Sequence, residues 1–131
     1  MVKTAAILFG LVFLVVGICG FFPNITTPMP DGDGGMLLGI FHVNLAHNIV
    51  HLASGAVFLL CGLAGAGPSR TFFRIFGIVY ALVAALGFYY GDQPILGIVA
   101  NNMPDVWLHV VLAVVMLFLG FGTSGRDTAT A

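Results

Sequence analysis

The sequence predicts an all-α integral membrane protein, built as a bundle of four transmembrane helices. Of its 131 residues, 60% are hydrophobic and only 7% are charged. Soluble domains carry roughly 25% charged residues, so four basic and five acidic side chains are too few to cover a surface that faces water. The chain also contains four apolar runs, each close to the roughly 20 residues with which a helix crosses a bilayer. We therefore expect a single transmembrane domain over residues 1–131, surrounded by lipid.

The four expected spans cover residues 4–22, 45–64, 72–90 and 104–121. The first apolar run is longer than the roughly 7–15 residues of a signal-peptide core, so we interpret it as a span. Pro104 suits the first turn of a helix, where its missing N–H would have no partner. Small residues at membrane helix interfaces let backbones approach closely, and the first and third spans offer four such positions: Gly10, Gly17, Gly77 and Gly87.

The few charges predict the orientation of the spans. The basic residues fall at the N-terminus, between the second and third spans, or after the fourth: Lys3, Arg70, Arg74 and Arg126. In a four-span protein these regions share one side of the membrane. The two loops on the other side carry acidic residues and no Lys or Arg: Asp31, Asp33 and Asp92. Because basic residues mark the cytoplasmic side, we expect a multi-pass protein of the inner (plasma) membrane with both termini in the cytoplasm.

The chain repeats itself. Leu38-Gly39-Ile40 recurs as Leu96-Gly97-Ile98, and at the same spacing three polar positions fall on polar positions: Asn44 on Asn102, His47 on Asp105, and His51 on His109. Apolar triplets alone could match by chance, but a polar residue meeting a polar residue three times argues against chance. We expect two helical hairpins, at about residues 4–64 and 72–121, related by an axis along the membrane normal. Equivalent faces of the second and fourth spans should then meet near the centre.

Polar residues gather on those two faces, near the outer ends of the spans. At about 100° per residue, one arc of the second span holds Asn44, His47, Asn48 and His51, and the matching arc of the fourth holds Asn102, Asp105 and His109. Ionisable residues inside a membrane are costly and by default indicate a functional site.

One chemistry that fits is a transition-metal site. Imidazoles and a carboxylate are ligands for a divalent ion such as zinc, iron or copper. The two spans supply this set as His47, His51, Asp105 and His109. Three asparagines would then orient the ligands through hydrogen bonds: Asn44, Asn48 and Asn102.

Two other interpretations stay open. His51 and His109, equivalent in the two repeats, could be paired axial ligands of a haem or another tetrapyrrole, although no stripe of small residues surrounds both. Alternatively, no cofactor binds and the polar residues are structural. Asn44 and Asn102 would then be helix N-caps, and Asp105 would lie in a first turn, where the helix dipole favours a carboxylate. The polar groups would hydrogen-bond to each other across the helices. The chain would then be a structural or accessory subunit of a membrane complex.

Other functional classes find little support in the sequence. It contains no Ser-His-Asp arrangement, phosphate-binding loop or Cys-x-x-Cys motif, so we assign no enzymatic activity. A net charge of −1 gives no basic surface for nucleic acid. The expected partners are the lipid bilayer and other membrane proteins, including further copies of the chain.

His42 is a weaker candidate ligand. It precedes the expected cap Asn44, and its equivalent in the second repeat is Ala100. Methionines on the same outer side would suit copper, but they are scattered in the sequence: Met29, Met36 and Met103.

Two stretches carry a resemblance to a known family: residues 41–52 (FHVNLAHNIVHL) and residues 101–109 (NNMPDVWLH). They resemble hallmark segments of an uncharacterised bacterial family of four-helix membrane proteins, a domain of unknown function. The similarity runs from the first helix to the fourth, with no departure at the motif residues. It implies the four-span fold and an inner-membrane location, and it implies no activity. In layout the chain is also similar to DoxX-like four-helix proteins, without a motif that would carry their function.

Overall fold

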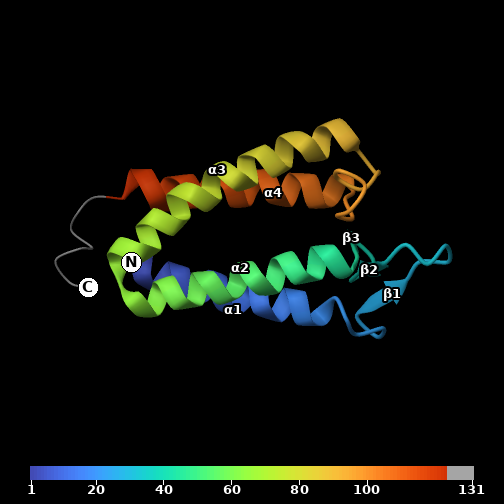
Figure 1. Cartoon of the computed structure of the whole chain (residues 1–131), viewed down its shortest axis with the longest axis horizontal. Helices are drawn as coiled ribbons and strands as arrows, with labels where there is room; N and C mark the ends of the chain where they lie inside the picture. The colour runs from blue at the N-terminus through green and yellow to red at the C-terminus, as the bar shows by residue number, and fades with distance from the viewer. Residues whose placement is uncertain (124–131) are drawn as a thin grey trace.

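The computed structural model describes residues 1–123 and is mostly helical. Its long helices are α1 (Val2–Cys19), α2 (Leu45–Ala64), α3 (Ala66–Tyr90) and α4 (Met103–Leu117), and a π-helical turn, η1 (Phe118–Gly122), continues α4 (Figure 1). Within the described residues, four helical segments are long and apolar enough to cross a membrane, with α4 and η1 counted as one. The predicted four-helix membrane fold is therefore confirmed.

Two helix boundaries differ by three residues or more from those predicted, when η1 is counted with α4. Helix α1 ends at Cys19, before residue 22, and α3 begins at Ala66, before residue 72. Pro68 is the third residue of α3. The first N–H groups of a helix have no intrahelical partner, so a proline costs nothing there. Only Gly65 separates α2 from α3, and its φ of 131° explains why a glycine makes this turn.

The connection between α1 and α2 contains a small antiparallel sheet that the sequence analysis did not predict. Its strands, in the order β1-β2-β3, are β1 (Thr26–Pro28), β2 (Gly35–Leu37) and β3 (Phe41–Val43). Strands of three residues are too short for an alternating pattern to be recognised. The sheet places this long connection as a cap over one end of the bundle (Figure 1).

The helices pack as two hairpins, α1 against α2 and α3 against α4 (Figure 1). Glycines allow the close approach that the sequence predicted. A Cβ on Gly10 would lie 2.7 Å from the Leu59 nitrogen, and one on Gly77 would lie 2.9 Å from the Leu117 side chain. Added Cβ atoms at Gly17 and Gly87 would also meet neighbouring side chains within 3 Å. All four predicted positions therefore lie at helix contacts.

Aromatic rings join the two hairpins in the middle of the bundle. Phe9 and Phe13 of α1 and Phe58 of α2 contact rings of α3, with centroids 5.2 Å apart for both Phe9–Phe73 and Phe58–Phe73. The cluster continues to Tyr80, which lies 5.9 Å from Phe13. This core seals the bundle beneath the polar residues, which lie between it and the sheet.

The two ends of the bundle differ in charge. One end holds the N-terminus, the Gly65 turn and the end of η1, while the other, here called the sheet end, holds β1–β3 and residues 91–102 (Figure 1). Among the described residues, the basic side chains lie toward the first end and the acidic ones at the sheet end, while Arg126 and Asp127 lie outside the described residues. The orientation with both termini in the cytoplasm stays a prediction.

Candidate metal centre

Two asparagines begin the helices that carry the polar cluster. The side-chain oxygen of Asn44 accepts the His47 N–H at 3.0 Å, and that of Asn102 accepts the Asp105 N–H at 3.4 Å. Each asparagine is the N-cap of its helix, an arrangement that satisfies an otherwise unpaired N–H of the first turn. The caps fix where α2 and α4 start and therefore which way His47 and Asp105 face.

The same asparagines connect the hairpins to each other. The Asn44 amide donates to the Ile98 carbonyl and the Asn102 amide to the Ile40 carbonyl, both at 2.9 Å. Residues Leu38 and Leu96, which precede these carbonyls, both have a φ of 54°. The two halves are thus locally alike where they meet, as the predicted duplication requires. The duplication of the complete hairpins stays a prediction.

His47 is oriented by the backbone of the opposite hairpin. Its Nδ1 lies 3.1 Å from the Ala100 carbonyl oxygen. A carbonyl oxygen only accepts, so we assign the proton to Nδ1, which leaves the lone pair of a neutral imidazole on Nε2. Metal-binding histidines commonly donate their other N–H to a carbonyl in this way, which fixes the tautomer and the ring. His47 therefore presents Nε2 to the cluster as a ready ligand.

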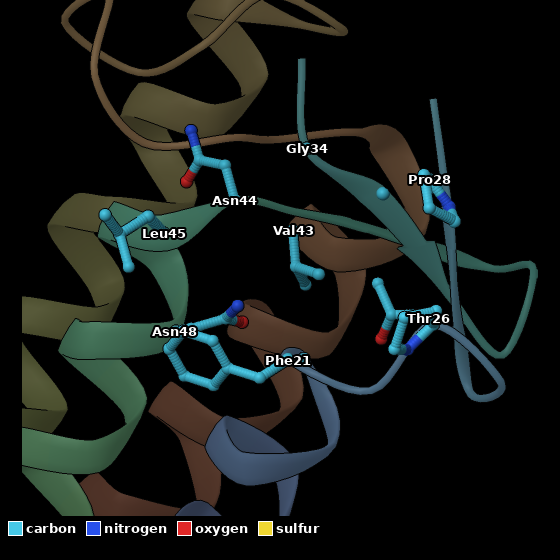
Figure 2. Close-up of a pocket in the computed structure, with 11 residues that line it drawn as sticks. Phe21, Thr26, Pro28, Gly34, Val43, Asn44, Leu45 and Asn48 are labelled. Carbon is cyan, nitrogen blue, oxygen red and sulfur yellow. The ribbon is translucent and has the colours of Figure 1, made fainter. Parts of the chain in front are cut away.

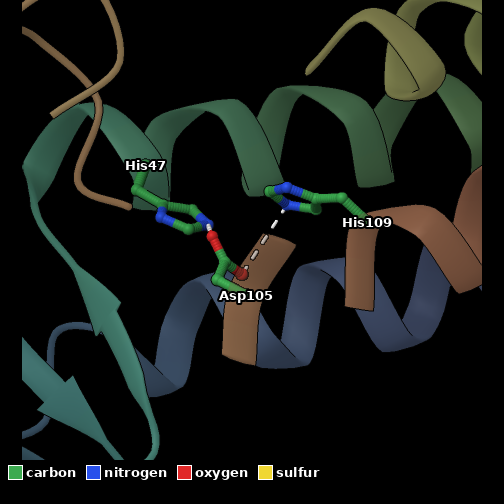
Figure 3. A group of neighbouring side chains, drawn as sticks. All are labelled: His47, Asp105 and His109. Atoms are coloured by element: carbon green, nitrogen blue, oxygen red, sulfur yellow. Dashed lines mark ion pairs between the residues drawn. The ribbon is translucent and has the colours of Figure 1, made fainter. Parts of the chain in front are cut away.

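Asp105 lies between the imidazoles of His47 and His109 (Figure 3). Its two oxygens are 3.8 Å from His47 Nε2 and 3.6 Å from His109 Nε2. Ligand atoms about 2.1 Å from a tetrahedral metal lie about 3.4 Å from each other. One ligand atom from each of the three residues falls within 4.8 Å of the others. The three side chains are therefore spaced nearly as the ligands of one metal ion would be.

His51 adjoins this group, one turn along α2 from His47. Its Nε2 is 3.1 Å from His47 Nε2, and the two rings stack with centroids 4.9 Å apart. The lone pair of His47 is on Nε2, and a second lone pair on His51 Nε2 would repel it at this distance. His51 Nε2 therefore carries a proton, which it donates to His47 Nε2. A metal ion replacing that proton would meet both nitrogens at an ordinary ligand spacing. The structure thus brings three predicted ligands together and places the fourth, His51, in contact with one of them.

Several polar atoms of the cluster lack a partner although they are buried. The four side chains are at most 8% exposed. Within residues 1–123, no hydrogen bond reaches three of their buried atoms: His51 Nδ1, Asp105 Oδ2 and His109 Nδ1. Buried polar atoms in proteins are nearly always paired, and an unpaired one requires an explanation such as an ion. The cluster is incomplete as a hydrogen-bond network.

Two small cavities border the cluster. One of about 150 Å³ is lined by His47, His51, His109 and Tyr80 together with apolar residues of α2, α3 and the last loop. The other, of about 110 Å³, touches His47, His51 and Asp105 from the side of α1 and the sheet. A metal ion held here would have space beside it for a further small ligand.

Comparison with known proteins adds the family of the chain. The family model described as a domain of unknown function (DUF4383) matches residues 3–122. The chain belongs to this family. In comparisons with this chain, no curated protein and no solved structure matched. Family membership agrees with the resemblance seen in the sequence, and the description of the family names no activity.

The remaining predicted residues of this DUF4383 protein lie around the cluster or apart from it. Asn44 and Asn102 act on the backbone as caps, and no hydrogen bond joins their side chains to the imidazoles in the described part of the chain. Asn48 is buried but lines a separate pocket of about 310 Å³ at the end of α1, where Figure 2 shows it near Phe21.

Sequence reasoning missed two contributors to the site. Tyr80 was not among the candidate site residues, yet its ring meets His109 edge-on, with centroids 5.3 Å apart, and lines the larger cavity. The Ala100 carbonyl orients His47 from a loop. A backbone carbonyl leaves no trace in residue identity, so no sequence pattern could have indicated it.

Proposed function

We propose that this membrane protein binds a divalent transition-metal ion between α2 and α4, through His47, Asp105 and His109. The observation that carries the proposal is the contact of His47 Nδ1 with the Ala100 carbonyl, because it leaves the lone pair on Nε2, the nitrogen that lies 3.8 Å from the Asp105 carboxylate. His51 would become the fourth ligand once the ion displaces the proton that it shares with His47. Zinc, iron and copper all accept such nitrogen and oxygen donors.

A purely structural role for the cluster is less well supported. In this protein the asparagines already link the hairpins, through the Asn44–Ile98 and Asn102–Ile40 hydrogen bonds. The histidines and Asp105 add buried atoms without partners, and a partly satisfied buried network destabilises a protein compared with an apolar core. A bound ion would coordinate the polar side chains of the cluster and so offset the cost of burying them.

A tetrapyrrole is also less well supported than a metal ion. Cofactor sites typically occupy about 300–1,000 Å³, whereas the cavity beside His51 and His109 measures about 150 Å³. The ring of Phe13 lies 5.1 Å from that of His51 and occupies space that a flat macrocycle would need. These dimensions suit a single ion with a small ligand.

The experiment is elemental analysis of the full chain, purified in detergent without chelator and then titrated with Zn²⁺ or Fe²⁺. We expect one metal ion per chain, and we expect His47→Ala, Asp105→Asn and His109→Ala each to lose it. Asn48→Ala is the matched control, because Asn48 is a buried polar residue of α2 that lies apart from the cluster. Lower pH should weaken binding, since protons compete with the metal for imidazole nitrogens.

Substoichiometric metal in the wild-type protein, even after titration, would contradict the proposal. So would equal retention of metal by all three ligand variants. The thermal unfolding midpoint of each variant without metal separates loss of a ligand from loss of the fold. An absorption band of a tetrapyrrole in the purified protein would favour the haem interpretation instead.

A further inference from the structure

A second group of side chains, of types that can bind metal ions, lines a cavity at the sheet end and shares no residue with the buried cluster. A cavity of about 400 Å³ opens between the sheet and the loop that follows α3. Its lining includes two thioethers, one imidazole and three carboxylates: Met29, Met36, His42, Asp31, Asp33 and Asp92. We call this group the Met/His vestibule. Neither the expected buried site nor the family description accounts for it.

The sheet brings the two soft ligands of the vestibule together. Met36 of β2 and His42 of β3 are direct partners in the antiparallel register. Side chains of such partners leave the same face of a sheet, with Cβ atoms about 4.5–5.5 Å apart. Met29 directly follows β1, and its N–H donates to the Gly34 carbonyl, which holds it beside the start of β2. Residues scattered in the sequence thus converge because of a sheet that the sequence did not reveal.

His42 is prepared as a ligand in the same manner as His47, but through the other nitrogen. Its Nε2 lies 2.6 Å from the Asp33 carbonyl oxygen, so Nε2 carries the proton and donates it. The lone pair of the neutral ring is therefore on Nδ1. The His42 side chain is also well buried, with 8% of the residue exposed. A fixed, buried imidazole with a free lone pair on the wall of a cavity is a feature of a ligand site.

The charges around the vestibule favour a cation. Asp31 and Asp33 come from the sheet connection, and Asp92 comes from the opposite loop. Neither connection contains a basic residue, from Gly20 to Asn44 or from Gly91 to Asn102. A cleft lined by one sign of charge raises the local concentration of the opposite ion. The thioethers then select among cations, because Met sulfur prefers Cu(I) to hard ions such as Mg²⁺ or Ca²⁺.

We propose that the Met/His vestibule binds one Cu(I) ion, through the sulfur atoms of Met29 and Met36 and Nδ1 of His42, with the three aspartates attracting the ion. This site is independent of the buried His/Asp cluster and does not rest on the function proposed for it.

The test is a titration with Ag⁺, an air-stable probe for Cu(I) sites, monitored by calorimetry. It uses the full chain in detergent in a Cys19→Ala/Cys61→Ala background, because free thiols also bind Ag⁺. Met36→Leu, which preserves side-chain volume, and His42→Ala should each weaken Ag⁺ binding by more than the roughly 10–100-fold typical of substituting residues that only support the ligands. Met103→Leu is the matched control, because Met103 lies at the same end but outside the vestibule. It should bind Ag⁺ as the wild type does.

A His47→Ala/His109→Ala double variant separates the two sites. It should keep the Ag⁺ site while losing the buried metal. Unchanged Ag⁺ binding in both Met36→Leu and His42→Ala would overturn the proposal, as would loss of the Ag⁺ site in the double variant. Tighter binding of Zn²⁺ than of Ag⁺ at the same residues would overturn the assignment to a soft cation.

Discussion

At the scale of single residues, backbone carbonyls determine which histidine nitrogens are free. The Ala100 carbonyl accepts a hydrogen bond from Nδ1 of His47, and the Asp33 carbonyl accepts one from Nε2 of His42. Both carbonyls belong to connections between helices, so the loops orient the candidate ligands that helices or strands carry. A ligand whose tautomer and rotamer are already fixed loses less entropy when it binds an ion. The sequence indicated His47 as a candidate ligand, but its tautomer could not be predicted without knowledge of the loop that holds Ala100.

Two leucines at the sheet end have a backbone conformation that leucine rarely adopts. Leu38 and Leu96 both have a φ of 54°, and their side chains are 67% and 65% exposed. The left-handed region costs an L-residue roughly 1–2 kcal/mol, and asparagine tolerates it better. We expect Leu38→Asn or Leu96→Asn to stabilise the protein by about 0.5–1 kcal/mol, measured as a higher unfolding midpoint in detergent.

Ile98→Asn is the control for this prediction. Ile98 is 64% exposed in the same loop but does not have a positive φ. An equal gain from Ile98→Asn would assign the effect to the polarity of asparagine at the membrane surface, and backbone strain would then not be its cause.

At the scale of elements, each N-cap asparagine performs two tasks that substitution can separate. Serine at position 44 retains a capping oxygen but cannot reach the Ile98 carbonyl, whereas alanine loses both interactions. We expect Asn44→Ser to cost about 0.6 kcal/mol, the average for a hydrogen bond between membrane helices. Asn44→Ala should cost about 1 kcal/mol more, the value of a cap. Unfolding in a denaturing detergent, compared with the exposed control Asn24→Ala, measures both.

Equal costs for the serine and alanine variants would show that the cap contributes nothing and would contradict this division. The equivalent substitutions at Asn102 provide a second, independent comparison, because its amide donates to the Ile40 carbonyl at the same distance.

The helices could be predicted from the sequence far better than their connections could. Apolar runs of about 20 residues reveal spans, and the boundaries of α2 were predicted at Leu45 and Ala64, as observed. The start of α3 was predicted at residue 72 but lies at Ala66, and Pro68 falls in the first turn, where a helix tolerates proline. The three-residue strands could not be predicted, since their pairing depends on partners distant in the sequence. Without the sheet, nothing in the sequence connected His42 with the methionines.

At the scale of the whole molecule, the two ends of the bundle are expected to face different compartments. Asp31 lies at the sheet end and Gly67 near the turn between α2 and α3, and both are exposed. In a Cys19→Ala/Cys61→Ala background, we expect Asp31→Cys to react with a membrane-impermeant maleimide in intact cells. Gly67→Cys should react only after the cells are permeabilised, because the basic end should lie in the cytoplasm. The opposite labelling pattern would reverse the predicted orientation.

The paired Asn44–Ile98 and Asn102–Ile40 hydrogen bonds have a consequence for ancestry. In an isologous contact, residue i of one subunit meets residue j of the other while j meets i, and these two bonds have that form within a single chain. Two separate hairpins placed about a twofold axis would make both bonds without any covalent link. The contact that now joins two halves of one chain is therefore of the kind that can hold a homodimer together, and fusion of two gene copies would have preserved it.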